Sequence, residues 1–284
     1  MKPYIVILIL LITSTSTLAD ENQEDVINHY KSYVNHKKSG DIYKAIAQLE
    51  SAYKLLPKAY PEPSKNKASV TYKLGFELMH AHPKSEIHRA EKLLLESIEI
   101  YESVYGSNNP ALIDPYMDLG VARLNINHFK RKTYMPAFEN AMDLADNDPE
   151  LLAILQYEIG VKLINKGLAS PTSKRLLKKS YTYFKKNNDP RHSLNALYLA
   201  KYMIARNDGH QASEYLVDAL NGFEKQNQST SYIMTTKALL VRSLEMAGER
   251  DTATKYCQEI AKAMPWGGDG ECSGQVILYN PMGV

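Results

Sequence analysis

The chain has 284 residues, of which 44% are hydrophobic and 23% are charged. This composition is close to the average of globular proteins, so it argues against a chain that is disordered throughout. The formal net charge is only +2, and lysine and arginine are spread along the sequence rather than gathered in one run. We therefore expect no nucleic-acid partner.

Residues 1–19 have the pattern of an export signal. Lys2 supplies a positive charge, residues 4–12 form a short apolar run, and small residues lead up to Ala19. The apolar run is shorter than the roughly 20 residues that a membrane span needs. We predict cleavage after Ala19 and a periplasmic or secreted mature protein without a transmembrane span. Retention of the segment as a membrane anchor is the alternative.

From residue 20 to residue 265 the apolar residues recur at helical spacing, and no stretch shows a convincing strand pattern. Gly40–Pro57 is the clearest helix, because its two alanines let a neighbouring helix come close and its proline is expected to end it. The same offsets return in Gly248–Pro265, with Cys257 in the position of a leucine. A pattern that recurs along a chain indicates a repeat array.

Helix start signals divide the rest of this region. Asn109, Asp148 and Asp189 each precede a proline and could cap a helix that begins there. Ser229 supplies a similar cap without a proline, and the successive intervals are 39, 41 and 40 residues. The sequence therefore predicts six helix pairs, at about residues 25–57, 64–105, 109–145, 148–186, 189–225 and 229–264.

These patterns resemble the tetratricopeptide (TPR) repeat. The spacing within Gly40–Pro57 is similar to the second half of a TPR, and Tyr116 with Leu119 and Gly120 is similar to the first half. The resemblance covers residues 25–265 and implies an all-α fold, an α-solenoid of about six antiparallel helix pairs. Because the period near 40 residues exceeds the usual 34, several repeats should have longer helices or loops.

The segment 266–284 is rich in glycine and then has a short apolar run, so we expect a tail that is partly disordered or forms a short strand. The sequence from Tyr256 to Trp266 resembles the end of the TPR region in periplasmic proteins that continue into a TonB-type energy-transducer domain. Leu278–Pro281 matches only a fragment of the motif that opens that domain. This resemblance implies a bacterial periplasm.

Motifs for catalysis are missing. The sequence has no nucleophile elbow, phosphate-binding loop, zinc-protease motif or complete dinucleotide fingerprint, so we predict a non-enzymatic protein without a cofactor. His80, His82 and His88 could supply three nitrogens to a metal ion, but a solvated helix end before Pro83 explains the first two more simply. We predict no metal site; a metal-binding or enzymatic α-solenoid is the alternative.

The chain has two cysteines, Cys257 and Cys272. An oxidising compartment would permit a disulfide between them. A buried thiol at Cys257 is the other interpretation, because the repeat pattern places an apolar residue there.

The remaining candidate for a site is a surface. In stacked helix pairs the first helices line a concave groove, and we expect the side chains near the small packing residues of those helices to face it. These predicted groove residues are Tyr72, Phe76, Met79, Leu124, Asn125, Tyr157, Asn165, Lys201, Arg242 and Glu245. Such a groove would suit an extended or helical peptide with an apolar stretch. The alternative is that longer helices bury many of these residues in the array itself.

The sequence thus favours an exported, non-enzymatic TPR scaffold that binds a protein or peptide partner at the cell envelope. An accessory component of a TonB-type energy-transduction and uptake system, within an envelope transport complex, is the second hypothesis.

Overall fold

The computed structural model describes residues 21–81 and 84–263. The predicted export signal, the predicted tail, His82 and Cys272 lie outside this part of the chain. The described residues form twelve α-helices and one short 3-10 helix, and no strand occurs among them. None of the helices in these ranges is long and apolar enough to cross a bilayer.

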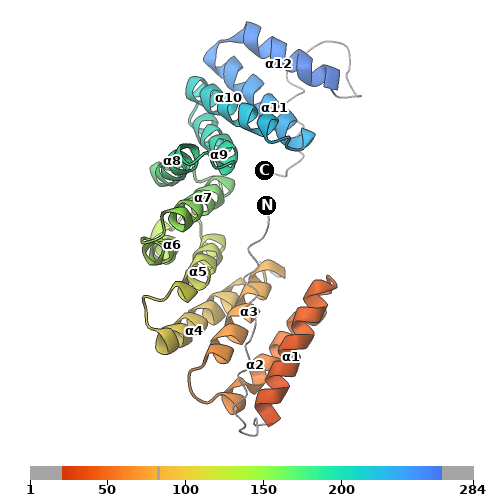
Figure 1. Cartoon of the computed structure of the whole chain (residues 1–284), viewed down its shortest axis with the longest axis vertical. Coiled ribbons are helices and arrows are strands. Elements are labelled where there is room, and N and C mark those ends of the chain that lie inside the picture. The colour runs from red at the N-terminus through yellow and green to blue at the C-terminus, as the bar shows by residue number, and fades with distance from the viewer. Residues whose placement is uncertain (1–20, 82–83, 264–284) are drawn as a thin grey trace. The chain divides into compact units, whose positions relative to one another are not determined.

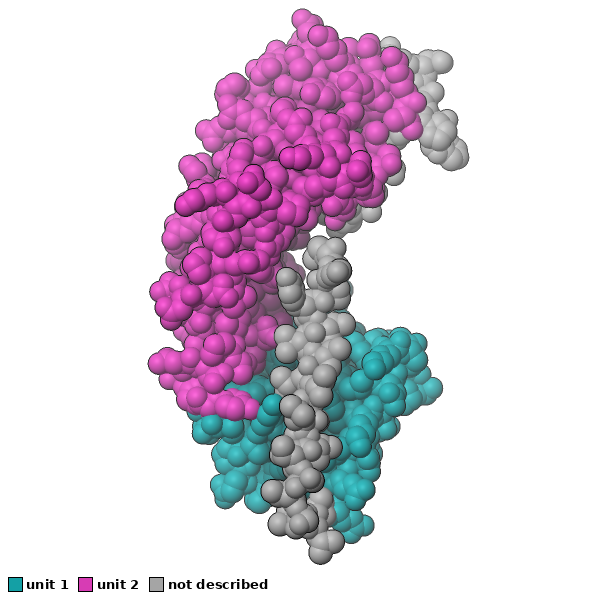
Figure 2. Space-filling model, in the orientation of Figure 1, with its two compact units in different colours: residues 1–104 teal, residues 105–284 magenta. Residues whose placement is uncertain are grey.

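Contacts divide the chain into two compact units, residues 1–104 and 105–284 (Figure 2). Unit 1 holds the first four helices, the last of which reaches one residue past its boundary: α1 (Glu21–Lys38), α2 (Ile42–Ala59), α3 (Lys65–Ala81) and α4 (Ile87–Tyr105). Unit 2 holds the 3-10 helix Pro110–Leu112, then α5 (Ile113–Ile126), α6 (Arg131–Leu144), α7 (Pro149–Asn165), α8 (Pro171–Lys186), α9 (Arg191–Ala205), α10 (Gly209–Lys225), α11 (Thr230–Ala247) and α12 (Arg250–Ala263).

The helices form consecutive antiparallel pairs of the TPR type, which confirms the predicted fold class. We call the odd-numbered members first helices and the even-numbered members second helices. In unit 2, α8 contacts α9 and α10 contacts α11, so each second helix links its pair to the next. Unit 2 is curved (Figure 2). Its first helices lie on the inner side of the curve (Figure 1). We call this side the inner face of unit 2.

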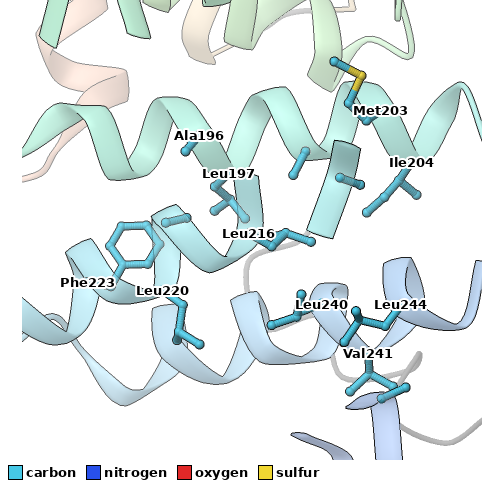
Figure 3. Close-up of a cluster of buried hydrophobic side chains, with 14 of the residues drawn as sticks. Ala196, Leu197, Met203, Ile204, Leu216, Leu220, Phe223, Leu240, Val241 and Leu244 are labelled. Carbon is cyan, nitrogen blue, oxygen red and sulfur yellow. The ribbon is translucent and has the colours of Figure 1, made fainter. Parts of the chain in front are cut away.

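Buried apolar side chains between successive helices hold unit 2 together. Figure 3 shows one such cluster, in which Leu197 of α9, Leu216 of α10 and Leu240 of α11 pack together and are at most 1% exposed. A second cluster surrounds Phe138 of α6 and Ile159 of α7. Truncating a buried leucine of this kind to alanine costs about 2–5 kcal/mol, so these contacts dominate the stability of the unit.

Close helix packing explains the glycine at the centre of several first helices. A Cβ atom added to Gly120 of α5 would overlap the ring of Phe138, and one added to Gly160 of α7 would lie 2.6 Å from Leu177 Cγ. Only a residue without a side chain leaves room for these large neighbours. The predicted packing role of Gly120 in the first half of a repeat is therefore confirmed.

Two local expectations need correction. Pro57 does not end its helix, because α2 continues to Ala59 and Pro57 lies inside it. A proline in the last turn of a helix removes one hydrogen bond, which an exposed helix end tolerates. Ser229 precedes α11 but its side chain makes no cap hydrogen bond.

The predicted caps at the other start signals differ in form. Asp148 Oδ1 accepts hydrogen bonds from the backbone N–H groups of Glu150 and Leu151, both at 3.1 Å, and so caps α7 as predicted. Asn109 caps the 3-10 helix in front of α5. The Asp189 carboxylate accepts from the backbone N–H of Arg191 at 2.8 Å, although Pro190 is the residue that precedes α9.

Candidate functional site

Three polar or aromatic side chains lie close together on two first helices of unit 2, α7 and α9. The ring centroid of Tyr157 on α7 lies 6.2 Å from that of Tyr198 on α9, with the two rings at 75°. The Lys201 Nζ lies 4.7 Å from the centroid of the Tyr198 ring. All three residues are half-buried. We call Tyr157, Tyr198 and Lys201 the tyrosine–lysine cluster.

Local sequence positions these groups. Tyr198 and Lys201 are three residues apart on α9, so both side chains lie on the same side of the helix. The ring of Tyr157 makes an edge-to-face contact with the ring of Phe184 on α8. The two ring centroids are 6.3 Å apart, and the interplanar angle is 73°. Because Phe184 is fully buried, Tyr157 rests on the rigid core of the unit. The cluster is therefore preorganised by packing.

Lys201 is a cation in an unfavourable place. Burial lowers the pKa of its ammonium group, because protein atoms replace part of its hydration shell. Among the described residues no carboxylate forms an ion pair with it. The ring of Tyr198 contacts the ammonium group through a cation–π interaction. An anionic or carbonyl group brought by a ligand would improve this environment.

Acidic and aromatic groups continue the cluster. Burial raises the pKa of Tyr157, and the nearby Tyr198, Tyr232 of α11 and Glu158 raise it further. Burial also raises the pKa of Glu158, with Lys162 acting in the opposite direction. The Glu158 side chain is nevertheless accessible to solvent.

The first helices of unit 1 use their charges differently. Glu77 of α3 is only 1% exposed, and it accepts a hydrogen bond from the Tyr33 hydroxyl at 2.9 Å. The Lys37 ammonium of α1 lies 2.6 Å from the other Glu77 oxygen. Burial raises the pKa of Tyr33, and the Glu77 charge adds to this effect. This network joins α1 to α3 and leaves no carboxylate oxygen of Glu77 without a partner.

The predicted groove residues fall into three groups. Tyr72, Met79 and Leu124 are 7%, 2% and 1% exposed, so they belong to the core, as the alternative interpretation anticipated. Half-buried side chains, which a partner could contact, are Phe76, Asn125, Tyr157 and Lys201. Exposed side chains are those of Asn165, Arg242 and Glu245.

The structure brings two of the predicted residues, Tyr157 and Lys201, together through Tyr198. The sequence interpretation missed Tyr198, which is the residue next to the buried Leu197. Leu197 is 1% exposed and faces the core. The signal that could have found Tyr198 is its spacing of three residues from Lys201, which places an aromatic ring beside a lysine on one helix face. In unit 1, Phe76 stacks on Tyr72 and His80 instead.

The alternative sites can be placed only in part. His80 lies in the last turn of α3, where its Nδ1 is 2.8 Å from the Phe76 carbonyl oxygen. Within residues 21–81 and 84–263 no group of three His, Cys, Asp or Glu side chains could hold a metal ion. Cys257 is fully buried on α12, in the leucine-like position that the repeat pattern predicts. Its predicted disulfide stays a prediction, since Cys272 is not among the described residues.

No family model matches the chain, and no curated protein matches its sequence. Solved structures match its fold. The apo form of RapI is 14% identical, with 87% of this chain and 78% of that chain covered and a TM-score of 0.58. BtubC from P. vanneervenii is 13% identical, covering 86% and 91% of the two chains, with a TM-score of 0.56.

A Rap protein solved in complex with competence and sporulation factor is 12% identical, with 84% of this chain and 69% of that chain covered and a TM-score of 0.53. Identities this low show a shared fold and nothing finer. The chain is a TPR-like α-solenoid.

Proposed function

We propose that this protein is a non-enzymatic scaffold that binds a peptide or protein segment on the inner face of unit 2. The observation that carries the proposal is the tyrosine–lysine cluster. It combines accessible aromatic rings with a partly desolvated cation that has no carboxylate partner among the described residues. A polar side chain without a full set of partners, held beside packed aromatic rings, is typical of a ligand-binding site. A side chain that serves only to pack the fold usually has its partners within the fold.

The chemistry of the cluster suggests which features the segment carries. A carboxylate or backbone carbonyl would accept from Lys201, and apolar side chains would cover the rings of Tyr157 and Tyr198. Glu158, on the same helix as Tyr157, would accept from an N–H donor. The Rap protein solved with competence and sporulation factor supports the general idea, because a protein of this fold holds a bound factor.

A pull-down with matched variants tests the proposal. Purified full-length protein is immobilised, and the partners it recovers from an envelope extract are quantified for Lys201→Gln, Tyr198→Ala and the control Lys54→Gln. Lys54 is exposed on the second helix α2, in the other unit. We expect both cluster variants to lose at least about tenfold in recovery, because each removes a central contact of about 1.4 kcal/mol or more. Equal recovery by all three variants would contradict the proposal.

We also propose that the protein is exported to the bacterial cell envelope. The basis is the pattern of residues 1–19, with a basic start, an apolar run and small residues before Ala19. The intact mass of the protein isolated from the periplasmic fraction should correspond to a chain that begins at Asp20. Recovery of the full-length chain from the cytoplasm alone would exclude export, and full-length chain in the membrane fraction would indicate a retained anchor.

An accessory role in a TonB-type uptake system is the second candidate. It rests on the resemblance of residues 256–266 to the end of the TPR region in periplasmic transducer proteins. Deletion of the gene should then impair uptake of siderophores or other large nutrients. Unchanged uptake would remove this version and leave the scaffold proposal intact.

A further inference from the structure

Helix α8 carries a local excess of positive charge that the balanced composition of the whole chain conceals. Its 16 residues include six lysine or arginine residues and no aspartate or glutamate. The whole chain, in contrast, has 34 basic and 32 acidic residues. This difference makes α8 the feature of unit 2 that most needs a physical explanation.

Two of the six basic side chains make contacts with other helices of unit 2. Lys185 donates to Asp218 of α10 at 2.9 Å and to the Tyr181 hydroxyl at 2.6 Å. The Lys174 Nζ lies 5.6 Å from the ring centroid of Tyr202 on α9. Both contacts link α8 to the following helices, so packing accounts for these two residues.

The other four, Arg175, Lys178, Lys179 and Lys186, are exposed and have no ion pair among the described residues. At 3.6 residues per turn they fall on one side of α8, opposite the buried Leu177 and Phe184. They extend over about 16 Å along the helix axis. We call these four residues the basic stripe of α8.

Helix stability does not explain the basic stripe. Arg175 stands three and four residues before Lys178 and Lys179, and like charges at these spacings destabilise a helix by repulsion. Lys186 is the exception among the four, because it lies in the last turn of α8, where the helix dipole favours a cation. Residues that destabilise their own helix, and that gain no stabilising contact within the protein in return, are expected at functional surfaces.

We propose that the basic stripe docks an acidic polypeptide segment with carboxylates at helical spacing. The stripe is narrow, and the second helices before and after α8 carry exposed acids: Glu139 on α6, 3.9 Å from Arg131, and Glu214 on α10, 3.8 Å from His210. A flat anionic bilayer would meet these acids as well, whereas a single acidic segment would meet only the stripe. The stripe also offers no apolar side chain to lipid, because the apolar side of α8 faces the core.

This surface is separate from the tyrosine–lysine cluster, which lies on the first helices. The exposed Phe129, the kind of residue that could enter a membrane, belongs to the loop between α5 and α6, in another helix pair. The proposal therefore does not depend on the binding site of the inner face, and either can fail without the other.

The test uses the full chain and a fluorescent synthetic helical peptide with glutamates at every third or fourth position. The same peptide with glutamine in place of glutamate is the control ligand. The charge-reversal variant is Arg175→Glu, Lys178→Glu, Lys179→Glu and Lys186→Glu. Its matched control, Lys54→Glu, Lys58→Glu, Lys92→Glu and Lys255→Glu, changes the net charge equally at exposed residues of other helices. A variant with glutamine at the four stripe positions is included in case the reversal fails to fold.

We expect anisotropy to show that wild type binds the glutamate peptide and not the glutamine peptide, more weakly as salt rises. Charge reversal should weaken binding at least about tenfold, because four exposed ion pairs contribute about twofold or more each. The glutamine variant should lose part of the affinity, while the matched control should stay within about twofold.

Three results would overturn the proposal. The first is no binding of the glutamate peptide at low salt. The second is an equal loss in the stripe variants and in the matched control, which would mean that only net charge matters. The third is tighter stripe-dependent binding of phosphatidylglycerol vesicles or of a single-stranded oligonucleotide than of the peptide, which would assign the stripe to lipid or to nucleic acid.

Discussion

The two units use charged residues on their first helices in opposite ways. In unit 1, Glu77 is buried and bound on both oxygens, by Tyr33 and by Lys37. In unit 2, Lys201 is half-buried, and no carboxylate pairs with it among the described residues. A charge whose partners lie within the fold stabilises the fold, whereas a charge without one is available to a ligand. The same helix-pair scaffold therefore provides a structural polar network in one unit and a candidate binding surface in the other.

The largest expected effect comes from replacing these two lysines with methionine. Lys37→Met leaves the Glu77 carboxylate buried without a cation, and we expect a loss of about 2–3 kcal/mol in the free energy of unfolding. Lys201→Met removes a partly desolvated cation, so stability should be unchanged or slightly higher. Urea denaturation of both variants measures the difference. Equal losses would mean that the two lysines play the same role.

Glycine packing should also distinguish the units. Gly120→Ala in α5 places a methyl group against the Phe138 ring and should cost about 1–3 kcal/mol. Gly75→Ala in α3 meets Leu93 Cβ at 3.1 Å and the Ala90 carbonyl oxygen at 3.2 Å, so a small shift would accommodate it. Its cost should stay below about 1 kcal/mol, since alanine also favours the helix. Thermal unfolding of the two variants checks this order, and a larger loss at Gly75 would contradict it.

Removing a helix cap should have a smaller effect on the free energy of unfolding than the substitutions above. Asp148→Ala removes two hydrogen bonds to the start of α7 and should lower the free energy of unfolding by about 1 kcal/mol. Ser229→Ala removes no cap bond and should be nearly neutral. Denaturation curves recorded under one set of conditions would show the difference. Similar losses for both variants would mean that these cap hydrogen bonds do not decide helix stability here.

The smallest effect is the pH dependence contributed by Lys201. Because burial lowers its pKa in the folded protein, the unfolded chain holds this proton more tightly. The stability of wild type relative to Lys201→Met should therefore rise as pH increases from the folded pKa toward the ordinary value near about 10.4. Labelling with an amine-directed reagent, followed by mass spectrometry, should give a pH midpoint for Lys201 below the ordinary value for a lysine. A midpoint at or above that value would contradict this assignment.

Much of the fold could be predicted because helix pairs are encoded locally. Start signals such as Asp148 before a proline, and small residues such as Gly120, fix where helices begin and where they approach one another. The predicted pairs agree with the observed ones to within a few residues at most ends. Pro57 was misjudged because a proline near an exposed helix end removes little.

The candidate site was predictable only in part. Which side chains of a helix are exposed depends on how the helices pack against one another, and the sequence of a single helix does not determine that packing. A shift of one residue turns a helical side chain by about 100°, so the buried Leu197 and the half-buried Tyr198 are neighbours in the sequence but differ in exposure. Sequence alone also cannot show that Lys201 lacks a carboxylate while Lys37 has one. The partner of Lys37, Glu77, lies 40 residues away in the chain.

The central claim is that a partner binds the inner face of unit 2 at the tyrosine–lysine cluster. The most direct measurement places a photoactivatable amino acid at position 198 in one full-length variant and at position 54 in another. Each variant is irradiated in an envelope extract. The account predicts a discrete covalent adduct from position 198 that excess unlabelled wild type suppresses, and no such adduct from position 54. Adducts of equal yield from both positions, or none from position 198, would contradict it.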